Sequence, residues 1–277
     1  MRKRVIIAII IFLTLPLTSC NKYKDLLSIN IIDVGQGDCI LISTPENKNI
    51  LIDGGDENSE RVIKSYLKKR KIKKLYIVIA THFDKDHIGS LDYIIDKFNI
   101  GKVYTSKDID KSQAYNNLIK SCRNKNLNFE ILKKGDKIKI TKDINIIVLN
   151  PSYIQENKNL NSIAINLSYI NMDFLFTGDC EESNEVDMIN SYDLENVDFL
   201  KIAHHGSSSS SSDKFIKETS PDIAVISCGY KNQYGHPHKS TLDTLNKYKV
   251  KTFRTDINGD LVFYSDGYKI FTNKKYK

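Results

Sequence analysis

All six histidines of this 277-residue chain fall in three short segments. Two lie in the first segment, an adjacent pair in the second and two more in the third: His82, His87, His204, His205, His236 and His238. Histidines with purely structural roles would be expected to scatter along the chain. Because imidazole is the commonest metal ligand in proteins, this grouping predicts a metal site that is assembled from distant loops.

The first segment reads HFDKDH, residues 82–87, and adds the carboxylates of Asp84 and Asp86 to its two imidazoles. It directly follows an apolar run at residues 75–80, which is typical of a buried strand. A loop at the end of such a strand is where a rigid scaffold presents reactive groups. Nitrogen and oxygen donors at this density suit a divalent metal. The alternative is a solvated turn with two incidental histidines.

Three further apolar runs end in residues of the same chemical types. The runs cover residues 174–178, 197–203 and 223–227, and the residues that follow them are Asp179, the pair His204 and His205, and the pair His236 and His238. A Gly-Asp pair is by itself a common turn, so Asp179 is a candidate ligand only in combination with the other segments. The ends of packed strands are a common location for active sites.

The apolar pattern predicts strands and helices in alternation. Strand-like runs come first, at residues 29–34, 39–43 and 50–52. Helical spacing then predicts helices near residues 59–69, 90–98, 112–122, 182–189 and 242–248. This order is typical of an α/β domain whose sheets are covered by helices. The sequence shows no Gly- or Pro-rich linker that would divide it, so we expect a single domain over residues 28–277.

The N-terminus has the features of an export signal. Basic residues at positions 2–4 precede an uncharged apolar stretch at residues 5–17, which is shorter than the roughly 20 residues that a membrane-spanning helix needs. The stretch ends in LTSC, where small residues precede Cys20 as in a bacterial lipobox. We expect residues 1–19 to be a lipoprotein signal peptide, Cys20 to carry the lipid and residues 20–27 to form a tether. A plain signal peptide or an uncleaved anchor is the alternative.

Charge and cysteine content limit the classes of partner and site. Loss of residues 1–19 would lower the formal net charge from +7 to +4, because that segment carries three basic and no acidic residues. We expect the lysines to be spread over the surface. A mildly positive net charge permits a phosphate-bearing substrate but does not indicate one. None of the cysteines forms a CxxC pair, which counts against a thiolate zinc site. Their apolar surroundings predict mostly free thiols.

Together these segments resemble the metallo-β-lactamase fold, and more closely the periplasmic or extracellular nuclease-like domain of the DNA-uptake protein ComEC and its stand-alone relatives. The family's motifs follow in order: IDVGQGD at 32–38, LIDGG at 51–55, HFDKDH at 82–87, LFTGD at 175–179, LKIAHHGS at 200–207 and YGHPH at 234–238. The similarity covers about residues 28–271. It implies a four-layer αββα sandwich that binds two divalent metal ions about 3.5–4 Å apart.

The resemblance also implies roles for the first ligands. His82 and Asp84 would bind one metal, Asp86 and His87 the other, and Asp179 would bridge the two. Metal binding would lower the pKa of a bound water toward about 7 and supply hydroxide at neutral pH. Asp86 is therefore expected to be essential for catalysis as well as for metal binding.

The two later histidine pairs leave alternatives open. His205 and His236 are the preferred metal ligands. His204 and His238 are the alternatives, His204 in contact with the substrate and His238 as the group that protonates the leaving group.

Three residues are expected to support the site. Asp53 would lie behind the metal ligands and orient one of them. Ser207 and Ser208 are candidates for hydrogen bonds to phosphate, although the serine run at 207–212 also reads as a mobile loop.

Two departures from the family pattern shift the expected metal. The second position of the metal motif is Asp84 rather than histidine, as in the ComEC-like branch. The sequence holds no histidine between His87 and Asp179, and asparagine and serine stand at positions 161–162 where many zinc relatives carry one. A site richer in oxygen favours manganese or magnesium, with zinc as a further candidate. The same departures count against β-lactamase activity.

The function expected from these features is hydrolysis of phosphodiesters, of nucleic acid foremost, by a lipid-anchored enzyme on the extracytoplasmic face of the membrane. A second interpretation is hydrolysis of small or surface-polymer phosphodiesters, such as choline-phosphate. A third is a non-catalytic DNA-binding lipoprotein that keeps a structural metal. The resemblance also raises a DNA-uptake channel as a partner.

Overall fold

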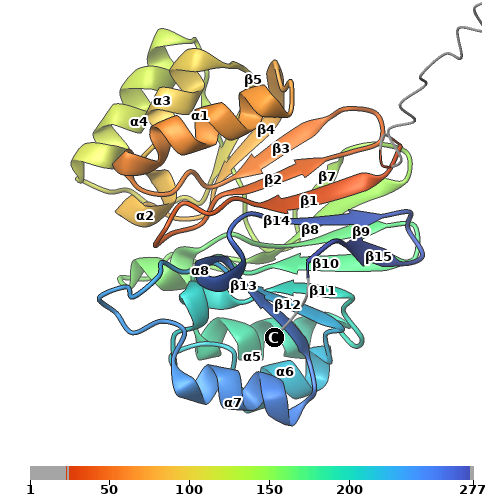
Figure 1. Ribbon diagram of the computed structural model, residues 1–277. Helices are drawn as coiled ribbons and strands as arrows, with labels where there is room; N and C mark the ends of the chain where they lie inside the picture. The colour runs from red at the N-terminus through yellow and green to blue at the C-terminus, as the bar shows by residue number, and fades with distance from the viewer. Residues whose placement is uncertain (1–22, 24, 275–277) are drawn as a thin grey trace, which may run out of the picture.

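The structure, a computed structural model, describes residue 23 and residues 25–274 (Figure 1). The proposed signal peptide, Cys20 and half of the tether, residues 20–22 and 24, lie outside the described residues. Among the described helices, none is both long enough and apolar enough to cross a membrane.

The first sheet has eight strands in the order β15-β14-β1-β2-β3-β4-β5-β6. The strands are β1 (Leu27–Ile31), β2 (Ile40–Ser43), β3 (Asn49–Ile52), β4 (Lys74–Ala80), β5 (Asn99–Thr105), β6 (Phe129–Ile131), β14 (Leu261–Ser265) and β15 (Ile270–Thr272). Pairing is antiparallel from β15 to β3 and parallel from β3 to β6. The C-terminal strands therefore extend the edge of the N-terminal sheet.

The second sheet has seven strands in the order β13-β12-β11-β10-β9-β8-β7. They are β7 (Lys137–Lys139), β8 (Ile144–Asn150), β9 (Ala164–Tyr169), β10 (Met172–Phe176), β11 (Phe199–Lys201), β12 (Ile223–Ile226) and β13 (Lys251–Arg254). Strands β10 to β13 are parallel, so their C-terminal ends meet at one edge of the sheet.

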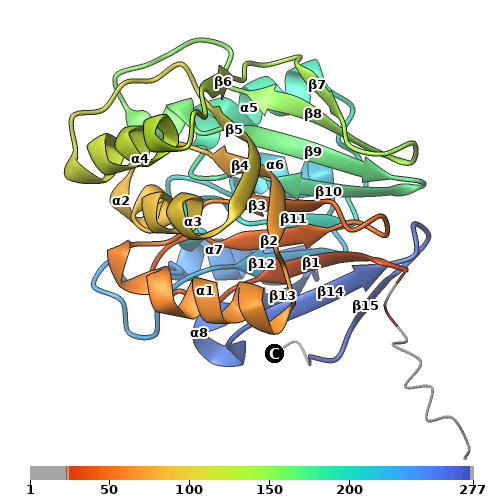
Figure 2. The same cartoon turned by 90° about the horizontal axis from the view of Figure 1, so that it is seen from above.

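Helices cover the outer face of each sheet (Figures 1 and 2). On the first sheet lie α1 (Glu60–Lys69), α3 (Leu91–Lys97) and α4 (Gln113–Asn124), with the short α2 (Lys85–Ile88) beside them. On the second lie α5 (Glu182–Ser191), α6 (Asp213–Thr219) and α7 (Lys239–Lys247), and α8 (Thr255–Asn258) follows β13. This arrangement confirms the predicted four-layer αββα sandwich.

Strand β4 shows why its sequence is a continuous apolar run. Ile77 and Ile79 face the core between the two sheets, whereas Val78 and Ala80 face the core under the helices. The second half of the strand, residues 77–80, is thus buried on both faces and has no position for a polar side chain. Each isoleucine buried in this way contributes roughly 1.5–3 kcal/mol of transfer free energy.

The predicted helices at 59–69, 90–98, 112–122, 182–189 and 242–248 correspond to α1, α3, α4, α5 and α7. Helix α6 was not predicted, because only Phe215 and Ile216 are apolar among its seven residues and it directly follows the serine run. Its N-cap Ser212 accepts a hydrogen bond from the Phe215 amide, and Phe215 and Ile216 are buried. The prediction of free thiols is confirmed for the four described cysteines, all of which are buried.

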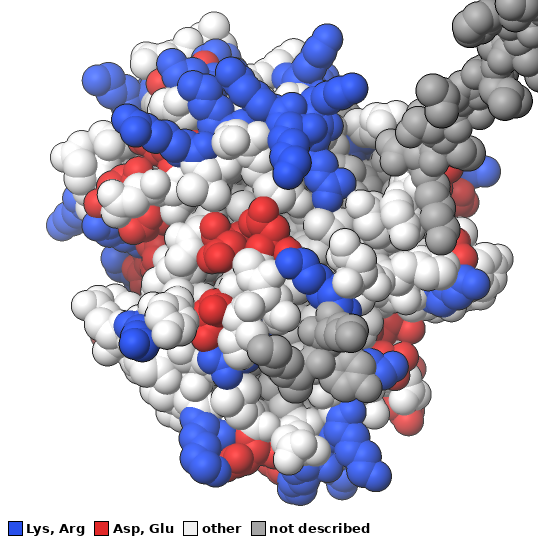
Figure 3. Space-filling model, in the orientation of Figure 1, with Lys and Arg blue, Asp and Glu red and all other residues white. Residues whose placement is uncertain are grey.

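The expectation of evenly spread lysines is wrong for one segment. Residues 61–74, which run from the second residue of α1 through the turn to the first residue of β4, carry eight Lys and Arg residues and no acidic residue. These side chains contribute to the basic area that gathers over α1 in Figure 3. This segment is therefore one local concentration of basic charge, beside the helical layer that covers the first sheet.

Candidate metal centre

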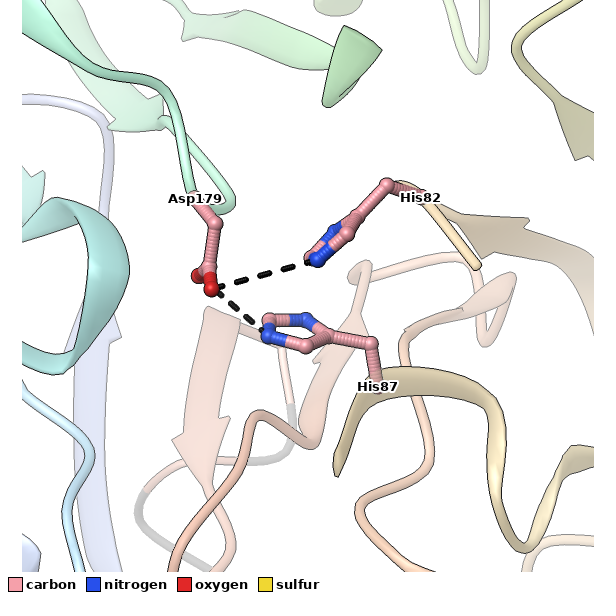
Figure 4. A group of neighbouring side chains, drawn as sticks. All are labelled: His82, His87 and Asp179. Atoms are coloured by element: carbon pink, nitrogen blue, oxygen red, sulfur yellow. Dashed lines mark ion pairs between the residues drawn. The ribbon is translucent and has the colours of Figure 1, made fainter. Parts of the chain in front are cut away.

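The predicted ligand loops converge at one edge of the sandwich. His82 and His87 lie just beyond the end of β4, and Asp179 lies just beyond the end of β10. Figure 4 shows the carboxylate of Asp179 facing both imidazoles. Its Oδ1 lies 3.2 Å from His87 Nε2, and its Oδ2 lies 3.9 Å from His82 Nε2. His82 and His87 follow a strand of the first sheet and Asp179 follows a strand of the second, and together the three side chains could hold one cation.

The second histidine segment, after β11, completes the cluster. His205 Nε2 lies 3.3 Å from Asp86 Oδ2 and 3.7 Å from Asp179 Oδ2, and with His87 these groups form a second potential metal-binding set. His204 Nε2 lies 3.8 Å from Asp179 Oδ2. Asp179 therefore faces all four imidazoles, as expected of a carboxylate shared between two ions.

Hydrogen bonds orient the two imidazoles of the first segment. His87 Nδ1 lies 2.8 Å from Asp53 Oδ2, and both side chains are fully buried. The Thr81 hydroxyl donates to the same Asp53 oxygen at 2.7 Å, which leaves it to accept from His82 Nδ1 at 3.2 Å. Each Nδ1 thus has a hydrogen-bond partner, and each Nε2 faces the cluster, where it could bind a cation. Asp53 lies where the sequence predicted a supporting residue.

The later pair is oriented in the same way. His205 Nδ1 donates to the backbone carbonyl of Ser227 at 3.0 Å, and His204 Nδ1 pairs with the Ser209 hydroxyl at 3.2 Å. Both residues have left-handed backbone conformations, with φ of 54° and 47°. Such conformations cost of order 1–3 kcal/mol for a residue other than glycine, and they are found where the surrounding structure fixes a functional geometry.

The cluster has the property expected of a metal site, namely buried polar atoms without partners. Among the described residues, the Nε2 atoms of His82, His87 and His205 and the Oδ1 atom of Asp179 are buried and make no hydrogen bond. Such atoms are rare because each costs about 1–3 kcal/mol. Three imidazole nitrogens that face carboxylate oxygens form a donor set for a divalent cation. The residues present therefore fit the metal that the sequence predicted.

The charges of these groups are strongly coupled. Burial opposes a charge on His87, but the carboxylates of Asp179 and Asp53 outweigh it and raise the pKa of His87 well above its ordinary value. The pKa of His205 likewise rises to about 9, because Asp179 and Asp38 outweigh burial. The pKa of the Asp179 carboxyl is held well below its usual range, since His87 and His205 outweigh burial. Without metal, protons on His87 and His205 would balance the buried carboxylates around them.

A buried ion pair lies directly behind the cluster and was not predicted. Lys201, at the end of β11, places its Nζ 2.9 Å from Asp38 Oδ2, and both side chains are almost fully buried. Asp38 Oδ1 lies 3.6 Å from His205 Nδ1. The loop from β1 to β2 is thereby joined to the second sheet and to a candidate ligand. A lysine inside the apolar run 197–203 was the signal for this pair, because a buried lysine needs an acidic partner.

Two glycines are required by close packing at the centre. A Cβ on Gly37, whose φ is +135°, would lie 2.3 Å from the backbone carbonyl oxygen of Asp86. A Cβ on Gly206 would lie 2.6 Å from the Pro237 side chain. Both close approaches join segments that are far apart in the sequence, so these glycines allow the loops to converge.

The third histidine segment lies beside the cluster. The ring centroid of His236 is 5.6 Å from that of His204 and 6.1 Å from that of His205. Burial and the neighbouring His205 lower the pKa of His236 to about 4. His236 does not belong to the ligand groups found among the described residues, whereas His205 does. Its assignment as a metal ligand stays a prediction.

His238 and the serines have other partners in this structure. His238 Nδ1 accepts the Ser208 amide at 2.9 Å, and its Nε2 donates to the Tyr234 carbonyl at 3.2 Å. Ser207 is buried, and its hydroxyl bonds with that of Ser209. The serine run is thus fixed by hydrogen bonds. The roles predicted for His238, Ser207 and Ser208 in proton transfer and phosphate binding remain untested.

The family profile described as the metallo-β-lactamase superfamily matches residues 32–230. The chain belongs to the metallo-β-lactamase superfamily. Within it, ComE operon protein 3 of Bacillus subtilis is 30% identical over 253 residues, which cover 85% of this chain and 32% of the relative. Recombination protein 2 of Haemophilus influenzae is 28% identical over 241 residues, which cover 84% of this chain and 28% of the relative. The chain spans about a third of the length of these relatives.

Solved structures share the fold. The metallo-β-lactamase fold protein YhfI from Bacillus subtilis superposes with a TM-score of 0.58 at 14% identity, and the match covers 87% of this chain and 100% of that chain. A metallo-hydrolase from Ignicoccus hospitalis gives a TM-score of 0.56 at 13% identity over 85% of this chain and 98% of that chain. At these identities the likeness concerns the fold alone.

The chain is a ComEC-like member of the superfamily and has Asn161 and Ser162 at the position where many zinc relatives carry a histidine. Asn161 is buried and donates to Asp108 Oδ2 at 2.9 Å. The Ser162 hydroxyl accepts the backbone amide of Asp179 at 3.1 Å. Ser162 therefore positions the shared carboxylate. Asp84 is partly exposed, and its Oδ2 lies 3.8 Å from His82 Nε2 while Lys158 faces its Oδ1 at 3.5 Å.

Proposed function

We propose that this protein is a metal-dependent phosphodiesterase that cleaves nucleic acid outside the cytoplasmic membrane. The observation that carries the proposal is the set of buried, unpartnered imidazole nitrogens arranged around Asp179. It is supported by relatives whose names refer to competence and recombination. A site that merely stabilised the fold would not need so many converging ligands, which argues against a non-catalytic DNA-binding protein.

We assign the ligands to two overlapping sets. His82, Asp84 and Asp179 form the first, with His204 beside them. Asp86, His87 and His205 form the second and share Asp179. The balance of three carboxylates and three or four imidazoles favours manganese, with zinc and magnesium as the alternatives. Divalent ions bound there would activate water at neutral pH and offset negative charge on a phosphoryl oxygen.

The residues of the chain then have defined tasks. Asp53 and the Ser227 carbonyl hold His87 and His205 in the tautomer that offers Nε2 to a cation. Lys201 holds Asp38 against His205 from behind. The low pKa of His236 keeps its imidazole neutral at physiological pH, so it can accept a hydrogen bond beside His204 and His205.

We further propose that Cys20 anchors the protein by a lipid to the extracytoplasmic face of the membrane. The lipobox-like LTSC sequence and the preceding apolar stretch support this location. Nucleic acid outside the membrane is then the accessible substrate, and a DNA-uptake channel is a natural neighbour for such an enzyme.

The test uses residues 21–277 as purified protein. Bound metal is measured by mass spectrometry, and single- and double-stranded DNA are assayed beside a chromogenic phosphodiester with added manganese. We expect manganese-dependent cleavage of DNA. Cleavage of the small ester alone would favour the surface-polymer substrate, and DNA binding without turnover under each metal tried would refute the enzymatic proposal.

A further inference from the structure

The loop between β12 and α7 exposes two tyrosines beside the metal centre. Tyr230 is 73% exposed and Tyr234 is 55% exposed, so neither ring is explained by packing in the core. Between them, Lys231 places its Nζ 5.3 Å from the centre of the Tyr230 ring. Large exposed aromatic side chains beside a candidate active site point to contacts with a ligand.

The loop that carries these rings is rigidly held. The Asn232 side chain donates to the Gly229 carbonyl at 2.9 Å and to the His236 carbonyl at 2.6 Å. Its oxygen accepts the amides of Tyr234 and His236 at 3.2 and 3.0 Å. The Tyr234 carbonyl is held in addition by His238. A single asparagine thus closes the turn from both sides, and the tyrosine is fixed in its exposed position.

An aromatic row runs from Tyr234 to the ligands. The Tyr234 ring stacks on His236, with centroids 5.6 Å apart and planes tilted by 22°. The His236 ring lies 6.1 Å from that of His205, which lies 5.3 Å from that of His87. A flat group that stacked on the outer face of Tyr234 would extend this row away from the metal ligands, with Tyr234 and His236 between it and His205.

We propose that Tyr234, with Tyr230 on the same loop, forms a stacking subsite for a nucleobase of a strand whose backbone passes the metal centre. The proposal rests on the proposed function and narrows its substrate to nucleic acid with unpaired bases. Every base offers a flat aromatic face, whereas bases in a duplex are already stacked. The positive charge of Lys231 would attract the phosphates on either side of such a base. The same lysine disfavours the cationic head of a choline ester, the other group that exposed tyrosines attract.

The test compares the binding of two short fluorescent single strands, oligothymidine and an abasic strand of equal length, in the presence of a chelator. Wild-type protein should bind oligothymidine more tightly than the abasic strand. Tyr234→Ala should weaken binding of oligothymidine by about 5- to 100-fold and leave binding of the abasic strand unchanged. Tyr234→Phe should retain the preference. Tyr268→Ala is the matched control, because Tyr268 is 67% exposed in the turn between β14 and β15.

Each outcome bears on the proposal. The proposal of a subsite is overturned if Tyr234→Ala weakens the binding of both strands equally, or if Tyr268→Ala abolishes the preference for the strand with bases. Wild-type protein that cleaves DNA but does not distinguish the two strands also overturns it and leaves the proposed nuclease function intact. Wild-type protein that neither binds nor cleaves either strand refutes the nuclease function together with the subsite. A base preference that Tyr234→Ala removes supports the proposal even before the metal is identified.

Discussion

Replacement of Lys201 by methionine tests the buried ion pair behind the metal centre. Methionine keeps most of the volume and removes the charge that lies 2.9 Å from Asp38. The Asp38 carboxylate is 1% exposed and would remain buried without this partner. Removing one member of a buried pair typically costs about 3–5 kcal/mol, because the other charge is left uncompensated. We expect Lys201→Met to lower the free energy of unfolding by this amount.

The double variant Lys201→Met/Asp38→Asn separates the charge from the packing. Because it removes both charges, we expect it to recover at least about 2 kcal/mol relative to the single variant. The control is Lys102→Met, which breaks an ion pair of similar length, 2.8 Å to Glu130, whose side chains are 51% and 44% exposed. That variant should unfold at nearly the wild-type urea concentration, because exposed pairs are screened by water.

The measurement is urea unfolding of metal-free protein, followed by circular dichroism. The transition midpoints and slopes of the four proteins give the free energies directly. The reasoning is refuted if Lys201→Met unfolds at no lower urea concentration than Lys102→Met, or if the double variant is no more stable than Lys201→Met. Either result would mean that Lys201 does not compensate the buried charge of Asp38.

Three further predictions concern the metal centre and the membrane. Asp86→Ala should abolish phosphodiester turnover while the unfolding midpoint stays near that of wild type, and an active variant would refute the role of Asp86 in the second ligand set. In metal-free protein, Asp179 and Asp38 outweigh burial and raise the pKa of His205 to about 9. This stabilisation is fully present below the unfolded value near 6.5 and lost as the pH rises through 9. Thermal melts with a chelator should therefore show decreasing stability over that window, and a flat profile would contradict the prediction. Cys20→Ala should release the protein from the membrane fraction or block its processing, and unchanged retention of the variant would argue for an uncleaved helix.

The sequence by itself determined the fold and the chemical types at the site. Apolar runs such as residues 77–80 can be recognised because a segment of strand that is buried on both faces excludes polar side chains. The candidate ligands His82, His87, Asp179 and His205 could be named because they follow such runs, and the structure brings them together. Helix α6 was missed, since its seven residues carry too few apolar positions for a helical period to be recognised.

Only the tertiary structure decided which groups meet. The sequence left both members of each later histidine pair open, and the fold brings His205 to Asp86 while it directs both ring nitrogens of His238 to backbone groups. The partnership of Lys201 and Asp38 was equally hidden, because the two residues are 163 positions apart, Lys201 at the end of β11 and Asp38 in the loop between β1 and β2. Contacts between residues so distant depend on how the two sheets pack, and local pattern in the chain carries no information about that packing.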